Sequence, residues 1–165
     1  MVKLVYGPML GALIFASCLG LPPRAGLLAE AFAHGAHEHF APGEPGDPKK
    51  PFRIVRVTML EDSKKMRFEP AVVDVRPGEQ VRFEIFNEGS WNHEFVLASE
   101  AANRKHAELM KKFPDMEHAD PNAVRLSPFA SGAILWKFTR RGAFEYACLI
   151  PGHLEAGMHG QVIVK

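Results

Sequence analysis

The chain has 165 residues, of which 47% are apolar and 24% are charged, and its formal net charge is +1. This composition is typical of a globular protein with room for one domain, and it excludes a disordered or collagen-like polymer. The small net charge also argues against a nucleic acid as partner.

Residues 1–33 have the three parts of a secretory signal peptide: a basic start, an apolar middle and a small-residue cleavage site. No charged side chain occurs from Leu4 to Pro23, and a small-x-small pattern ends at Ala33. We therefore expect export to the periplasm, cleavage after Ala33 and no membrane span in the mature chain. Two alternatives remain, namely an uncleaved membrane anchor, because the uncharged stretch approaches the length of a bilayer span, and a lipoprotein anchored at Cys18.

Residues 34–51 are rich in His, Gly, Pro and charged side chains and show no apolar periodicity, which predicts a flexible arm ahead of a domain at 52–165. Three imidazoles, those of His34, His37 and His39, lie close together in this arm. Because imidazole clusters bind Cu(II), the arm is a candidate for secondary copper binding. The alternative is a solubilising arm that holds no metal.

The domain shows mainly the two-residue alternation of half-buried strands, and we expect these strands to be antiparallel. Turn-forming sequences such as Arg76-Pro77-Gly78-Glu79 separate them. The predicted strands are centred on residues 55–59, 81–85, 134–138, 144–148 and 162–164.

One segment, 99–113, has helical spacing instead. Ser99 is a suitable N-cap and Pro114 ends the pattern. The apolar face predicted for this helix consists of Ala102, His106, Leu109, Met110 and Phe113. The whole pattern predicts an all-β protein, a β-sandwich with one inserted helix.

Removal of residues 1–33 leaves Cys148 as the one cysteine of an exported chain. A free thiol in an oxidising compartment is prone to oxidation and has no internal disulfide partner. Burial, a covalent partner or a bound metal ion would each explain it. His153 and Met158 follow Cys148 at intervals of five residues, and His93 follows an earlier strand. Two histidines, one cysteine and a distant methionine form the ligand set of a blue-copper electron-transfer site.

The run from Phe52 to Lys165 resembles the cupredoxins, the family of plastocyanin, azurin and rusticyanin. More narrowly, the His-rich arm and two segments resemble the periplasmic copper-tolerance cupredoxins called CopI. The motifs that carry both resemblances are Val73-x-Val75-x-Pro77-Gly78-Glu79-x-Val81-x-Phe83, Asn87, His93 and Phe95, then residues 110–122, and Ala147-Cys148-Leu149-Ile150-Pro151-Gly152-His153-x-Glu155-Ala156-Gly157-Met158.

The resemblance implies a Greek-key sandwich with one type 1 copper centre, cycling between Cu(I) and Cu(II), whose ligands are His93, Cys148, His153 and Met158. It also implies a role in surviving excess copper. A soluble electron carrier of plastocyanin or azurin type, with a redox partner protein, is the alternative, and a metallochaperone is a third.

Other candidate residues have simpler explanations. We expect His106, His118 and His159 to be solvated, and Trp91 and Trp136 to be in the core. Met110, Met116 and His118 are a weaker candidate for a second soft-metal patch, because Met110 also fits the apolar face of the helix.

The sequence also predicts which chemistry is absent. Multicopper oxidases and copper nitrite reductases have histidine beside the type 1 cysteine, whereas here the neighbours are Ala147 and Leu149. The second cysteine of a binuclear purple-copper loop, the C-x-x-C-H haem motif and the common nucleophile and phosphate-binding motifs are missing. We therefore expect that the protein is not an enzyme.

Overall fold

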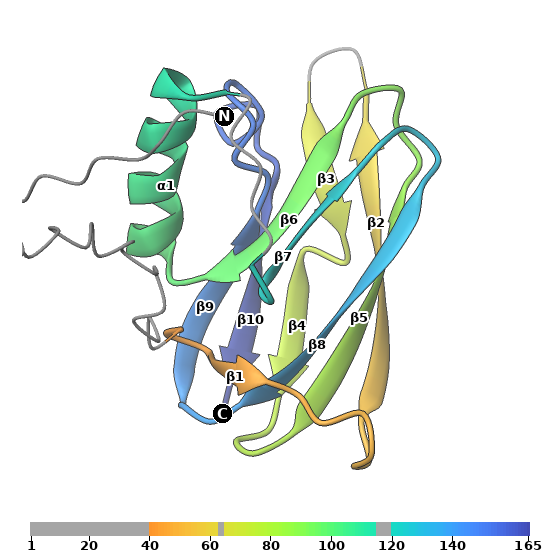
Figure 1. Ribbon diagram of the computed structural model, residues 1–165, viewed down its shortest axis with the longest axis vertical. Helices are drawn as coiled ribbons and strands as arrows, with labels where there is room; N and C mark the ends of the chain where they lie inside the picture. The colour runs from red at the N-terminus through yellow and green to blue at the C-terminus, as the bar shows by residue number, and fades with distance from the viewer. Residues whose placement is uncertain (1–39, 63–64, 115–119) are drawn as a thin grey trace, which may run out of the picture. The chain divides into compact units, whose positions relative to one another are not determined.

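The computed structural model describes residues 40–62, 65–114 and 120–165. Within these ranges, ten strands form two five-stranded sheets, and there is one helix (Figure 1). The strands are β1 (Gly43–Pro45), β2 (Arg53–Glu61), β3 (Met66–Glu69), β4 (Val72–Val75), β5 (Gln80–Asn87), β6 (His93–Ala98), β7 (Ala123–Leu126), β8 (Ser131–Phe138), β9 (Gly142–Ala147) and β10 (His159–Val164), and the helix is α1 (Glu100–Lys112).

The first sheet has the order β1-β8-β5-β2-β3 and the second the order β4-β10-β9-β6-β7. Several neighbours are distant in sequence, such as β5 and β8, as in a Greek-key sandwich. The predicted β-sandwich with one helix is therefore confirmed. The expectation of purely antiparallel strands is wrong, because β2 pairs with β5 and β4 pairs with β10 in parallel.

The space between the sheets is filled by aromatic side chains on alternate positions of their strands. Phe95 stacks on Tyr146, with ring centroids 5.0 Å apart, and Phe68 meets both rings edge-on. Trp136, as predicted, is fully buried. Such rings dominate the hydrophobic stabilisation of a core, and here they pack directly below the strand ends that carry the candidate ligands.

The helix begins and ends as predicted, but a different face is buried. The Ser99 hydroxyl accepts a hydrogen bond from the Ala102 amide as the N-cap. The buried residues are Asn103, Ala107 and Met110, whereas Leu109 and Phe113, assigned to the apolar face above, are exposed. Asn103 Nδ2 donates to the buried Glu145 carboxylate on β9 at 3.0 Å, and this contact fixes which face meets the sheet.

Part of the predicted flexible arm contributes to the sandwich. Residues 43–45 form β1, which pairs with β8, and the ring of Phe40 packs edge-on against Trp136. The sequence does not predict this strand, because three residues that include Gly and Pro show no alternation of apolar and polar side chains. Among the described residues, no helix is long and apolar enough to cross a membrane.

Candidate metal centre

The segments that carry the four predicted ligands lie at one end of the sandwich. His93 opens β6, and Cys148 follows the last residue of its neighbour β9, so strand pairing brings the two side chains to the same end. His153 and Met158 lie in the turn-rich segment that connects β9 to β10. All four residues are buried.

Backbone hydrogen bonds close the 148–158 segment on itself. The His153 amide donates to the Ile150 carbonyl, the Met158 amide donates to the His153 carbonyl, and the Cys148 amide donates to the Met158 carbonyl, each at 3.0 Å. These short-range bonds connect the backbones of Cys148, His153 and Met158. The Met158 side chain is fully buried in the same hydrophobic cluster as Cys148.

Three of the four side chains bring potential donor atoms together. The Nδ1 atoms of His93 and His153 are 3.2 Å apart, and the Cys148 Sγ lies 4.0 Å from the first and 3.3 Å from the second. Donor atoms that surround a divalent ion in one plane, at bonds of about 2.0 Å for nitrogen and 2.3 Å for sulfur, are separated by about 3.5–3.7 Å. The observed triangle is close to this size, so the cluster fits one metal ion with soft and borderline ligands.

Burial sets the protonation of this cluster. It raises the pKa of the Cys148 thiol to about 12, although the amide of Glu94 donates to the sulfur at 3.3 Å. It also lowers the pKa of both His93 and His153, which favours the neutral imidazoles that bind metals. Binding of a metal ion therefore has to release the thiol proton.

Two further residues lie beside the cluster and were not singled out as functional from the sequence. The Glu61 carboxylate at the end of β2 lies 3.4 Å from His93 Nε2. Trp91, predicted to be in the core, is instead 60% exposed, and its ring centroid is 6.0 Å from that of His153. No local pattern identifies Glu61, because three strands, β3, β4 and β5, separate it from His93 in the chain.

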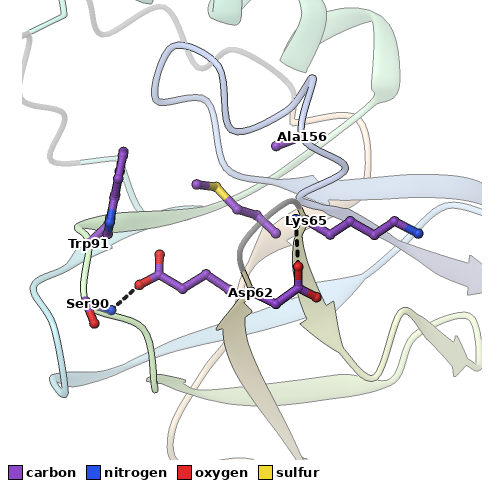
Figure 2. Close-up of a pocket in the computed structure, with 7 residues that line it drawn as sticks. Asp62, Lys65, Ser90, Trp91 and Ala156 are labelled. Carbon is purple, nitrogen blue, oxygen red and sulfur yellow. Dashed lines mark hydrogen bonds between the residues drawn. The ribbon is translucent and has the colours of Figure 1, made fainter.

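A surface hollow of about 540 Å³ opens next to these two residues. Ser90 and Trp91 border it on one side, and Lys65 and Ala156 on the other (Figure 2). Glu61 also lines the hollow, so its carboxylate lies between this surface and the buried His93.

Of the remaining candidates, those that the structure describes do not join the cluster. Met110 is fully buried against the sheet as part of the helix, so it is not available to a surface metal patch. The other proposed members of that patch, Met116 and His118, lie outside the described residues, as do His34, His37 and His39 of the arm. His159 is half-exposed, with its Nδ1 3.7 Å from Glu145.

Comparison with known proteins finds copper proteins whose sequences are similar to this chain. Residues 55–165 match the family described as copper binding proteins, plastocyanin/azurin family. The copper-resistant cuproprotein CopI of Rubrivivax gelatinosus is 54% identical over 134 residues, which cover 79% of each chain. The protein of the same name from Pseudomonas aeruginosa is 32% identical, over 83% of this chain and 89% of its own.

The fold has counterparts among solved structures. Auracyanin B superposes with a TM-score of 0.61 and 22% sequence identity, over 77% of this chain and 99% of its own. At this identity the likeness concerns the fold alone, and it supports the arrangement of two packed sheets.

Proposed function

Because this chain belongs to the plastocyanin/azurin family of copper-binding proteins, we propose that it acts in the periplasm to protect the cell from excess copper. It holds one type 1 copper centre, and we assign the ligands as His93, Cys148, His153 and Met158. The observation that carries the assignment is the buried triangle of two imidazole nitrogens and one sulfur. The tolerance role is supported by two relatives that are named copper-resistant cuproproteins.

Copper bound at this site supplies one-electron chemistry, because sulfur favours Cu(I) while imidazole suits both oxidation states. The chain contributes a preformed and rigid set of donors. Cys148 is held between the aromatic core and the sheet backbone, and the amide of Glu94 donates to its sulfur. Such a site takes up copper without a large rearrangement and keeps water away from the thiolate.

We also propose that the domain is not an enzyme. The residues on either side of Cys148 are Ala147 and Leu149, which are buried against the helix α1 rather than directed toward the candidate metal centre. Neither side chain is able to bind a second copper ion, so this strand offers no path to a second copper centre of the oxidase type.

A second candidate function, an electron carrier, is favoured by Trp91. Its exposed indole lies close to the buried ring of His153 and offers a surface where a redox partner would come near the copper ligands. Rapid reduction by a purified periplasmic redox protein, with no copper sensitivity in a deletion strain, would support this alternative.

Growth in rising copper concentrations tests the proposed role. A strain without the gene should be copper-sensitive, and the wild-type gene, but not Cys148→Ser, should restore growth. The matched control replaces His34, His37 and His39 by alanine, and this allele should still rescue. A deletion strain that grows as well as its parent would contradict the tolerance role, and rescue by Cys148→Ser would assign tolerance to the arm instead.

A further inference from the structure

A carboxylate contacts the ring edge of His93 that faces away from the candidate metal centre. Glu61 Oε2 lies 3.4 Å from His93 Nε2, and neither atom makes a hydrogen bond with any group among the described residues. His93 is fully buried, and the Glu61 side chain is only 15% exposed. A polar pair in such surroundings is stable only if the two groups satisfy each other.

The other oxygen of the same carboxylate anchors the loop that precedes His93. Glu61 Oε1 accepts a hydrogen bond from the Ser90 amide. Gly89 packs so tightly on Glu61 that a Cβ at this glycine would lie 2.9 Å from the carboxyl carbon. The position of Glu61 is therefore fixed by β2 on one side and by the 89–90 backbone on the other.

The ring nitrogen that faces Glu61 has to carry a proton when His93 binds a metal ion. His93 Nδ1 points at Cys148 Sγ and His153 Nδ1, so it is the nitrogen that must be free of a proton for ligation. In a neutral imidazole the proton is then on Nε2, where the acceptor it meets is Glu61 Oε2. Both neighbours of the carboxylate, the Ser90 amide and His93 Nε2, are thus donors, and each meets a different oxygen of the same side chain.

We propose that Glu61 is a positioning residue of the copper centre: it selects the Nε2-protonated form of His93, holds the ring with Nδ1 toward Cys148, and adds negative charge that favours Cu(II) over Cu(I). This inference rests on the assignment of His93 as a ligand in the proposed function. Carboxylates that orient a ligating histidine raise its basicity, and their loss typically weakens metal binding about 10- to 100-fold.

The test compares Glu61→Gln with Asp62→Asn. Both substitutions remove one negative charge, and Asp62 lines the same hollow, where its carboxylate accepts from the Lys65 amide and lies 3.7 Å from Arg67. In glutamine an NH2 group replaces one of the two oxygens, so one of the two donors loses its acceptor, and we expect Cu(II) affinity to fall about 10- to 100-fold. If the loss of Cu(II) affinity exceeds the loss of Cu(I) affinity by a factor of ten, the one-electron reduction potential rises by about 59 mV. Asp62→Asn should leave both affinities and the potential close to those of the wild type, and Glu61→Asp should restore part of the loss.

Unchanged Cu(II) and Cu(I) affinities in Glu61→Gln, or equal shifts in Asp62→Asn, would overturn the proposal. Since the glutamine variant could fail to fold, the second measurement uses the wild-type apoprotein, in which nitrogen NMR should show His93 protonated at Nε2. Protonation at Nδ1 would also overturn it. Neither measurement depends on growth in copper, so failure of the tolerance role and failure of this inference are distinguishable.

Discussion

Two regions supply the copper ligands, and they are held in place by different kinds of contact. In the segment from Cys148 to Met158, most backbone hydrogen bonds join residues that are at most ten positions apart, and one, from the Met66 amide to the Ala156 carbonyl, reaches a distant strand. In the segment from Asn87 to His93, the contacts reach distant parts of the chain, through the backbone amides of Asn87 and Glu88 and through side chains. Asn87 Nδ2 lies 3.1 Å from the carbonyl of Leu126 and 3.1 Å from that of Ser127.

The two halves of the centre therefore depend on different parts of the sequence. The 148–158 segment is encoded locally, by turn-forming residues and ligand spacing, and it should keep its shape when distant contacts are lost. The 87–93 segment depends on the tertiary structure, because Asn87 and Glu61 connect it to other elements. Loss of the Asn87 or the Glu61 side chain should therefore affect folding and copper binding together.

The largest effect is expected from Cys148→Ser, which removes the one sulfur in the triangle of donor atoms. The intense visible absorption of the Cu(II) form should disappear, because it arises from charge transfer between thiolate and copper. Absorption spectroscopy of the copper-loaded protein measures this, and circular dichroism of the apoprotein serves as the control for folding. A retained band would contradict the ligand assignment.

The same contrast explains how much of the site could be predicted from the sequence. The intervals between Cys148, His153 and Met158 are a local pattern, and the structure places donor atoms of His93, Cys148 and His153 within 4.8 Å of one another. Glu61 could not be predicted, since its contact with His93 depends on the parallel pairing of β2 with β5, whereas antiparallel strands were expected.

Errors in the predicted fold have a similar origin. Apolar spacing alone assigned Leu109 to the buried face of the helix, but the bond from Asn103 to the buried Glu145 determines which face meets the sheet. Trp91 was expected in the core because of its residue type, yet it lies in a loop and is exposed. Residue type predicts average burial, and only tertiary contacts determine the orientation of an element.

The second prediction concerns Asn87→Ala. Asn87 is fully buried. Its Nδ2 donates to the carbonyls of Trp91 and Leu126, and its Oδ1 accepts from the Gly89 amide at 2.9 Å. Because alanine leaves buried backbone groups without partners, the free energy of unfolding of the apoprotein should fall by about 2–4 kcal/mol. Urea denaturation measures this fall.

The exposed neighbour Asn92 provides the matched control for Asn87. Asn92→Ala removes a side-chain amide of the same kind, five positions further along the chain. It should change the unfolding free energy by no more than about 0.5 kcal/mol. Copper affinity should fall in Asn87→Ala only. If the two variants have the same free energy of unfolding, local contacts hold the 87–93 segment and its dependence on Asn87 is contradicted.

The third prediction tests the local segment through Gly152→Ala. Gly152 has φ of +90°, and a Cβ there would meet no atom within 4 Å, so the substitution acts through the backbone alone. An L-residue in this conformation costs about 1–2 kcal/mol. Gly78→Ala, at φ of +83° and with equally open space, should cost the same in urea denaturation. Only Gly152→Ala should alter the visible spectrum of the copper form, and an identical spectrum would indicate that the ligand loop tolerates this strain.

The smallest structural effect is expected from Met158→Leu. The side chain is fully buried, and exchange of methionine for leucine in a core usually costs less than about 1.5 kcal/mol. The backbone bonds from Met158 to Cys148 and His153 do not involve the side chain, so the loop should keep its shape and copper should remain bound. The reduction potential should nevertheless rise, because loss of a weak axial donor disfavours Cu(II). Voltammetry of the two proteins measures the difference, and an unchanged or lower potential would mean that the thioether is not an axial ligand.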